Sequence, residues 1–307
     1  MDLEGWLYDS YTEISENGVG GVRNALRPVK HKLLSGGNIF YDRGLPIYEC
    51  DWDLLIVLDA CRYDLMREVA DEYDWLPTPT AKRSLDSATA PWMRRNFTDQ
   101  WREAMAETTY ICGNPFSESE LRGADFDRMI ELWASAWTDP GTVPPEAVTD
   151  LTIRVMREDD PERLIAHYMQ PHCPFLDRPN LSKGKKLDRF GKQKWRDVWE
   201  RLHDGDVTEA AVWEGYQANL QRGLEEVEQL LRNVDANQVV VASDHGNATG
   251  EWGVYGHPPN LPLSVLRTVP WIETTASDTR EREPDSWLTT DATVSREEQL
   301  SALGYAE

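Results

Sequence analysis

The stretch Asp53-Leu-Leu-Ile-Val-Leu-Asp59 places five consecutive apolar residues between two aspartates, and it decides the fold. An apolar run of this length is typical of a strand that is buried on both faces of a parallel sheet. Further strands are predicted at 109–112, 164–169, 238–243 and 268–274, and helices at 62–73, 91–106, 125–137, 145–158 and 207–233. Strands that alternate with helices predict an α/β protein with a central, mostly parallel sheet flanked by helices.

The length of 307 residues is enough for one large domain with its own core. We expect residues 1–50 to form an N-terminal extension packed on that core, and residues 51–275 to form the α/β domain itself. Residues 276–307 are predicted to be a C-terminal tail of the same domain, ending in a short helix over 295–303.

The charge of the chain is strongly acidic, with 54 Asp and Glu against 32 Lys and Arg and a net charge of -22. This excludes a general nucleic-acid binder, because contact with phosphate backbones needs a basic surface. The acidic residues are dispersed along the chain, and such a surface is best tolerated when salt screens its self-repulsion. Our hypothesis is therefore a halophilic protein from a salt-accumulating cytoplasm, and an ordinary acidic protein is the alternative.

The N-terminal sequence and the spacing of the cysteines both favour an intracellular protein. The N-terminal sequence has no basic region followed by an apolar run, and no uncharged apolar stretch approaches 18 residues, so we expect a cytoplasmic protein without a membrane span. The four cysteines are far apart and suggest neither a zinc knuckle nor a disulfide framework. The oligomeric state is left open by the sequence.

Aspartate and histidine side chains follow three of the predicted strands. Asp59 ends the first strand, His172 follows another, and Asp244-His245 follow a third, with His257 twelve residues further on. Ligands of open parallel sheets bind at the carboxyl ends of the strands, where we expect these side chains to converge. Asp and His are ligands for a divalent metal such as Zn or Mn. The alternatives are that Asp59 caps a helix and that Asp-His-Gly is a simple turn.

Four segments, in order, carry a resemblance to a known family. Leu58-Asp-Ala-Cys-Arg-Tyr-Asp64 resembles the opening metal-binding motif of the sulfatase-like branch of the alkaline phosphatase superfamily, and residues 241–257 resemble its closing motif. The closing motif is especially similar to that of the phosphoethanolamine transferases; the branch also contains sulfatases and phosphoglycerol transferases. Residues 170–175 are similar to the family's His-x-Pro segment, and residues 298–305 to a carboxyl-terminal motif of many sulfatases.

The resemblance implies an alkaline phosphatase-like sandwich, with residues 51–275 as its catalytic domain. The implied function is a metal-dependent hydrolase or transferase acting on a phosphate or sulfate ester, on a substrate linked to a sugar, glycan or lipid. Asp59, Asp244, His245 and a nucleophilic hydroxyl would hold one divalent cation (Zn, Mn or Ca). His172 and His257 would contact the substrate phosphate, assist the leaving group or hold a second, weaker ion.

Two hydroxyls compete as the nucleophile at the start of a predicted helix. Thr89-Ala-Pro91 is similar to the Cys-x-Pro signature of sulfatases, whereas Asp86-Ser87-Ala88 resembles the nucleophile segment of alkaline phosphatases. We favour Thr89 over Ser87, and both could instead merely cap the helix. Sulfatases oxidise Cys or Ser to formylglycine, which Thr cannot form, so phosphoryl chemistry is favoured. The alternatives are a formylglycine-independent sulfuric ester hydrolase and a catalytically silent relative that binds a glycan or a partner.

Three further features each allow two interpretations. Residues 182–196 contain five of the eight lysines and carry seven positive charges and one negative; they could guide an anionic substrate or be a solvated loop. His167 lies inside a predicted strand and is expected to be a core residue. Arg62 is expected to pair with Asp64 or to anchor the loop, with a direct contact to substrate as the alternative.

Overall fold

The computed structural model describes residues 43–181 and 197–287. Seven of its strands form one sheet: β1 (Leu54–Leu58), β2 (Thr80–Arg83), β3 (Thr108–Cys112), β4 (Arg128–Glu131), β5 (Arg163–Tyr168), β6 (Ala236–Ala242) and β9 (Thr268–Ala276). The strand order is β2-β9-β6-β1-β5-β3-β4. A separate hairpin pairs β7 (Ala248–Thr249) with β8 (Tyr255–Gly256). The predicted α/β class is confirmed.

The sheet is parallel except at one side. The predicted decisive strand β1 lies at its centre, where Ile56 is opposite Ala166 of β5 on one side and Val241 of β6 on the other, both in parallel pairings. Only β9 runs against its two neighbours, β6 and β2. The carboxyl ends of β1, β5, β6 and β3 therefore meet at one edge of the sheet.

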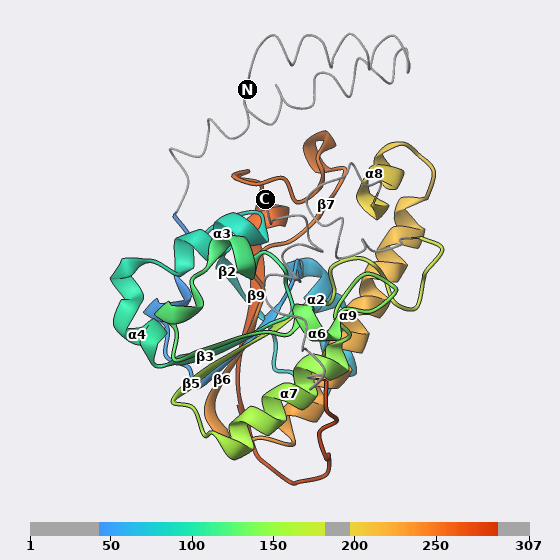
Figure 1. The fold of residues 1–307 in the computed structure, drawn as a ribbon. Helices are drawn as coiled ribbons and strands as arrows, with labels where there is room; N and C mark the ends of the chain where they lie inside the picture. The colour runs from blue at the N-terminus through green and yellow to red at the C-terminus, as the bar shows by residue number, and fades with distance from the viewer. Residues whose placement is uncertain (1–42, 182–196, 288–307) are drawn as a thin grey trace, which may run out of the picture.

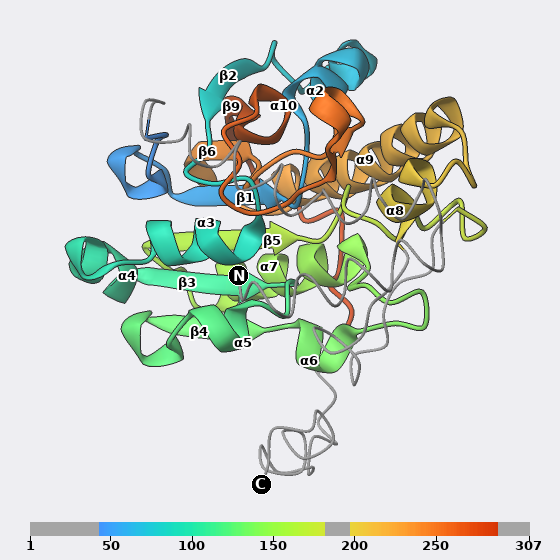
Figure 2. The same cartoon turned by 90° about the horizontal axis from the view of Figure 1, so that it is seen from above.

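Helices cover both faces of the sheet (Figures 1 and 2). One face packs against α2 (Tyr63–Val69), α7 (Pro145–Glu158) and α9 (Glu209–Leu231), and the other against α3 (Thr89–Asn96) and α4 (Arg102–Ala106). Shorter helices are α5 (Ser117–Glu120), α6 (Trp133–Ala136), α8 (Val198–His203) and α10 (Ser264–Arg267).

The apolar run of β1 explains why both faces are covered. Successive side chains of a strand point to opposite faces, so Leu54 and Ile56 join the core with α7 and α9, whereas Leu55 and Val57 join the core with α3. All five residues of this strand are almost fully buried. Each such side chain stabilises the fold by about 1.5–3 kcal/mol, so two helical layers are needed to cover the strand.

Two predicted helices are wrong in part. Residues 125–137 form β4 and the short helix α6, because the four residues of β4 pair in parallel with β3 and this sheet contact overrides a helical apolar spacing. The predicted helix 91–106 is divided between α3 and α4, with a 3-10 turn at Asp99–Trp101 between them. The polar edge strand β2 and the two-residue strands β7 and β8 contain no apolar run of the kind that identifies a buried strand, and they are not predicted from the sequence.

The C-terminal part of the described chain is fastened to the helices. After β9, Asp278 binds Arg157 of α7 at 2.8 Å, and Arg282 pairs with Asp150 of α7 and Glu226 of α9, both at 2.7 Å. These contacts join residues 278–282 to the main core. None of the described helices combines the length and apolarity needed to cross a membrane. The predicted N-terminal extension up to residue 42, the basic segment 182–196 and the helix 295–303 lie outside the described residues.

Candidate metal centre

Three buried side chains meet at the carboxyl edge of the sheet. Asp59 directly follows β1, and Asp244 and His245 follow β6 after one intervening residue. All three have exposures of 0%, and one ligand atom of each lies within 4.8 Å of the others. The strand-end rule therefore located residues that the structure brings together, although β1 and β6 are separated by well over one hundred residues of chain.

The two oxygens of Asp244 have different partners. Oδ1 accepts hydrogen bonds from the backbone amides of Ala60 at 2.8 Å and His245 at 2.9 Å. Oδ2 accepts from the Thr89 hydroxyl at 2.8 Å and lies 3.3 Å from His245 Nε2. One oxygen is thus used by the backbone, and the other faces the cluster.

The two oxygens of Asp59 also have different surroundings. Its Oδ2 accepts a hydrogen bond of 2.5 Å from Asn114 Nδ2, whereas its Oδ1 is buried and has no hydrogen-bond partner among the described residues. The distance from Oδ1 to His245 Nε2 is 3.9 Å. An unpaired buried carboxylate oxygen is costly unless a cation or a proton satisfies it.

The turn around His245 fixes which ring nitrogen faces the carboxylates. Its Nδ1 lies 2.9 Å from the Gly246 carbonyl, which can only accept, so Nδ1 carries the proton. In the neutral ring, Nε2 then has the lone pair and faces Asp244 and the Thr89 hydroxyl, 3.1 Å away. Glycine is required at 246, because a Cβ there would lie 2.2 Å from the carbonyl oxygen of Val265.

The donor set fits a divalent cation. Two carboxylate oxygens, one imidazole nitrogen and one hydroxyl are suitable ligands for Zn or Mn, and Asp59 Oδ1 needs a partner. Burial and the negative charge of Asp244 raise the pKa of Asp59 to about 6. Burial also acts to raise the pKa of Asp244, but the neighbouring imidazoles of His245 and His167, with hydrogen bonds from Ala60 and Thr89, lower it overall. A positive ion would stabilise both carboxylates in their ionised form.

The two candidate nucleophiles have different surroundings. Thr89 is the first residue of α3, 4% exposed, and its hydroxyl faces Asp244 and His245. Ser87 Oγ instead donates to the Pro258 carbonyl at 2.7 Å and accepts from the Leu261 amide at 2.9 Å. Ser87 therefore joins the loop before α3 to the loop that follows His257, while Thr89 belongs to the acidic cluster.

His172 and His257 lie beside the cluster and are partly buried. The ring centroids of His245 and His257 are 4.6 Å apart, and those of His257 and His172 are 5.1 Å apart. The Nδ1 atom of His257 donates to Asn247 Oδ1 at 2.6 Å. Burial disfavours the charged form of His172, but Cys173 and Asp59 raise the pKa of His172 to about 10. His172 can therefore donate a proton near neutral pH.

Several residues that support the centre were not singled out from the sequence. Ser243 Oγ accepts from the Cys61 amide at 2.8 Å and donates to the His245 carbonyl at 2.7 Å, so it joins the two turns. Asn114 follows a predicted strand, and the strand-end rule could have found it. Asn247 has no comparable signal, because its partner His257 lies ten residues away on the other side of a hairpin.

The expected pairing of Arg62 with Asp64 is confirmed at 2.6 Å, and Arg62 also anchors the neighbouring loop. Its guanidinium donates to the Asn247 carbonyl at 3.0 Å and to Glu251 at 2.7 Å. His167 is fully buried on β5, as expected of a core residue.

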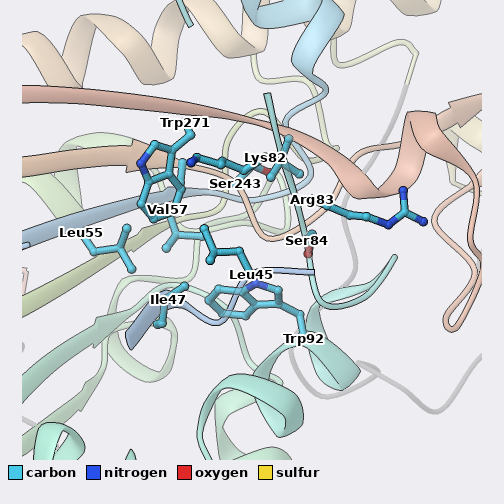
Figure 3. Close-up of a pocket in the computed structure, with 12 residues that line it drawn as sticks. Leu45, Ile47, Leu55, Val57, Lys82, Arg83, Ser84, Trp92, Ser243 and Trp271 are labelled. Atoms are coloured by element: carbon cyan, nitrogen blue, oxygen red, sulfur yellow. The ribbon is translucent and has the colours of Figure 1, made fainter. Parts of the chain in front are cut away.

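The pocket of Figure 3 is separate from this centre. It lies between β1, β2, β9 and the start of α3, and its lining is largely apolar. Ser84 and Ser243 line it, and their hydroxyls hold the carbonyls of Asp244 and His245. The pocket is therefore behind the turn that carries Asp244 and His245, and none of the candidate site residues lines it.

Comparisons with known proteins give the following neighbours. Neither models of protein families nor curated proteins match the chain. The soluble domain of lipooligosaccharide phosphoethanolamine transferase A from Neisseria meningitidis is 15% identical, covering 74% of this chain and 77% of that one, with a TM-score of 0.48. The C-terminal periplasmic domain of EptC from Escherichia coli, in complex with Zn, is 12% identical, covering 76% and 75%, with a TM-score of 0.48.

A 2-O GAG sulfatase is also similar, with 13% identity, coverage of 83% of this chain and 70% of that one, and a TM-score of 0.46. The structural neighbours are thus phosphoethanolamine transferases and sulfatases. These are the two kinds of protein that the sequence motifs resemble.

Proposed function

We propose that this protein is a metal-dependent phosphoryl transferase or hydrolase of the sulfatase-like kind, with Thr89 as its nucleophile. One observation carries the proposal. Thr89 is the first residue of α3, and its hydroxyl lies 2.8 Å from Asp244 Oδ2 and 3.1 Å from His245 Nε2. In the same cluster, Asp59 Oδ1 has no hydrogen-bond partner among the described residues. A hydroxyl among metal-ligating groups is the arrangement that an activated nucleophile needs.

Asp59, Asp244, His245 and the Thr89 hydroxyl would hold the cation (Zn, Mn or Ca), and His257 is near enough to join them or to bind a second ion. A divalent cation in this position lowers the pKa of a hydroxyl and polarises the ester oxygen. The mixed nitrogen and oxygen ligands favour Zn or Mn over Ca, which prefers six or more oxygens. The Escherichia coli neighbour is described as a complex with Zn.

The reaction divides into two displacements. In the first, Thr89 Oγ1 forms a bond to phosphorus, its proton passes to Asp244 Oδ2, and the bond from phosphorus to the alcohol oxygen breaks. The leaving alkoxide takes a proton from His172 or His257. The start of α3 favours the negative charge of the reacting group. In the second, an oxygen of water or of an acceptor alcohol forms a bond to phosphorus and gives its proton to the deprotonated histidine, the bond from phosphorus to Thr89 Oγ1 breaks, and Thr89 Oγ1 takes back the proton from Asp244. Attack by water gives hydrolysis, and attack by an acceptor alcohol gives transfer.

The substrate is proposed to be a phosphate ester on a sugar, a glycan or a lipid-linked group. Its class is supported by the motif resemblance and by the names of the neighbours, which include a phosphoethanolamine transferase and a GAG sulfatase. Threonine cannot form the formylglycine of sulfatases, which favours phosphate over sulfate. The net charge of -22 supports a halophilic, cytoplasmic protein.

The test is an assay of nitrophenyl phosphate, its phosphodiester and nitrophenyl sulfate with Zn, Mn and Ca. We expect metal-dependent cleavage of a phosphate ester, a phosphorylated Thr89 detectable by mass spectrometry, and loss of both in Thr89→Ala. Thr89→Ser should keep part of the activity, and Thr152→Ala, which removes a buried hydroxyl on α7, should keep all of it. Full activity of Thr89→Ala would refute the nucleophile.

Two other outcomes favour the alternatives. Preferred cleavage of the sulfate ester would favour a formylglycine-independent sulfatase. Absence of turnover with every ester and metal, together with retained glycan binding, would favour a catalytically silent relative.

A further inference from the structure

Each carboxylate of the centre presents a single oxygen to the cluster, and the reason differs between the two. Asp244 Oδ1 is held by the amides of Ala60 and His245. Asp59 is held instead by a side chain: its Oδ2 accepts from Asn114, which comes from the carboxyl end of β3. The orientation of Asp59 therefore depends on Asn114.

The amide of Asn114 has a defined orientation. Its Oδ1 accepts a hydrogen bond of 3.0 Å from the Phe116 amide, so its Nδ2 is the group that faces Asp59 Oδ2, 2.5 Å away. Asn114 is only 4% exposed, and its backbone carbonyl accepts from Cys112 Sγ at 3.3 Å. Contacts on three sides hold the residue in one position.

His167 closes the space behind the same oxygen. Its Nε2 lies 3.8 Å from Asp59 Oδ2, too far for a hydrogen bond, and has no partner among the described residues. Its Nδ1 is 2.7 Å from the Tyr110 hydroxyl, and the two rings are stacked with an interplanar angle of 3°. Asp59 Oδ2 thus lies between Asn114 and His167, while Oδ1 faces His245.

We infer that Asn114 is a positioning residue that reserves Oδ1 of Asp59 as a one-oxygen ligand and thereby biases the centre toward Zn over Ca. This inference rests on the proposed metal-dependent function. Tetrahedral Zn sites bind few ligands at short distances, whereas Ca sites use six to eight oxygens and often bidentate carboxylates. Without Asn114, Asp59 Oδ2 could turn toward the cation, giving a looser site with more oxygen ligands.

The test is to titrate the metal-free protein with Zn and with Ca by calorimetry, and with Co while recording the visible absorption, which reports coordination number. In Asn114→Ala we expect Zn affinity to fall about 10- to 100-fold, the range typical of lost outer-shell partners. Ca affinity should fall less or rise, and the Co spectrum should shift toward higher coordination.

The matched control is Asn233→Ala, which removes an equally buried asparagine that binds Arg282 and Gln229 far from the centre. It should lower thermal stability but leave Zn affinity and the Co spectrum unchanged. Should Asn114→Ala fail to fold, Asn114→Leu keeps the volume and removes the same donor. Wild-type affinity and spectrum in either Asn114 variant would overturn the inference alone. A wild-type protein that binds none of these cations would overturn the proposed function and the inference with it.

Discussion

The turn after β6 and the turn after β1 hold their carboxylates by different means. In the first, Asp244 accepts hydrogen bonds from two backbone amides, one of them that of the next residue. In the second, Asp59 is held by the Asn114 side chain of another strand. A carboxylate held by backbone amides is insensitive to most side-chain changes nearby, whereas a carboxylate held by one side chain can be released by one substitution.

The two turns are also joined to each other. The Ala60 amide binds Asp244, Ser243 binds the Cys61 amide, and Arg62 binds the carbonyl of Asn247. Ala60 has a φ of 62°, a left-handed conformation that costs a residue with a Cβ roughly 1–2 kcal/mol. The hydrogen bond of the Tyr216 hydroxyl to the Ala60 carbonyl offsets part of this cost.

The largest expected effect comes from removing either charge of the centre. In Asp59→Asn and in Asp244→Asn we expect kcat/KM to fall by at least about 1,000-fold, because each loses several kcal/mol of interaction with the cation and the reacting ester. Both variants should fold, since the amide oxygen of an asparagine can replace Asp59 Oδ2 toward Asn114, and Asp244 Oδ1 toward the amides of Ala60 and His245. Steady-state kinetics and circular dichroism are the measurements, and Asp99→Asn, at a highly exposed carboxylate, is the control.

If only one of these two variants lost activity, the centre would not use both carboxylates as ligands. Equal activity of all three variants with the wild type would contradict the site altogether.

A smaller effect is expected from breaking the ionic link between the turns. Arg62 is buried and binds Glu251, which is 30% exposed, and Asp64, which is 53% exposed. Arg62→Gln should lower the free energy of unfolding by about 2–3 kcal/mol, below the range for fully buried pairs because solvent screens both partners. Urea unfolding measures this. Arg128→Gln, which breaks a half-exposed pair with Asp159, should cost under about 1 kcal/mol, and an equal cost for both would argue against the anchor.

Removal of the hydrogen bond between the Ser243 hydroxyl and the Cys61 amide should lower the stability less than removal of Arg62 does. Ser243→Ala removes the 2.8 Å acceptor of the buried Cys61 amide and leaves it only a long hydrogen bond of 3.4 Å to the Leu58 carbonyl, which is expected to lower the free energy of unfolding by about 1–3 kcal/mol. It should also reduce kcat, since the turns that carry Asp59 and Asp244 lose one connection. Ser119→Ala, at an exposed serine, is the control for both measurements. Unchanged stability of Ser243→Ala would show that the turns do not depend on this hydroxyl.

The smallest expected effect is the change of cation affinity with pH. In the metal-free protein Asp59 has a raised pKa of about 6, so its proton stabilises the folded state in acid, and this contribution is lost as the pH rises through 6. A cation competes with that proton. Zn affinity should therefore rise about tenfold per pH unit below pH 6 and level off above it. Calorimetric titrations from pH 5 to 8 measure this, and an affinity that is flat below pH 6 would contradict it.

Sequence patterns predicted elements well where local and global preferences agree. Helix α7 was predicted at 145–158 and spans Pro145–Glu158, because it begins with proline and has a regular apolar face. The prediction failed at 125–137, where a short edge strand forms only because β3 offers it a partner. A contact of that kind depends on residues distant in the chain, and no local pattern encodes it.

The residue types of the centre could be predicted from the sequence. They are an Asp or His after β1, β5 and β6, a hydroxyl shortly before a proline, and a glycine after His245. These residue types follow from local requirements, because a buried parallel strand exposes functional groups at its end and a sharp turn needs glycine. Only the tertiary packing decided two further points. It determined which oxygen of Asp59 faces the cluster, and it placed Thr89 rather than Ser87 next to Asp244. Such choices depend on Asn114, Pro258 and Leu261, which only folding brings beside the two turns.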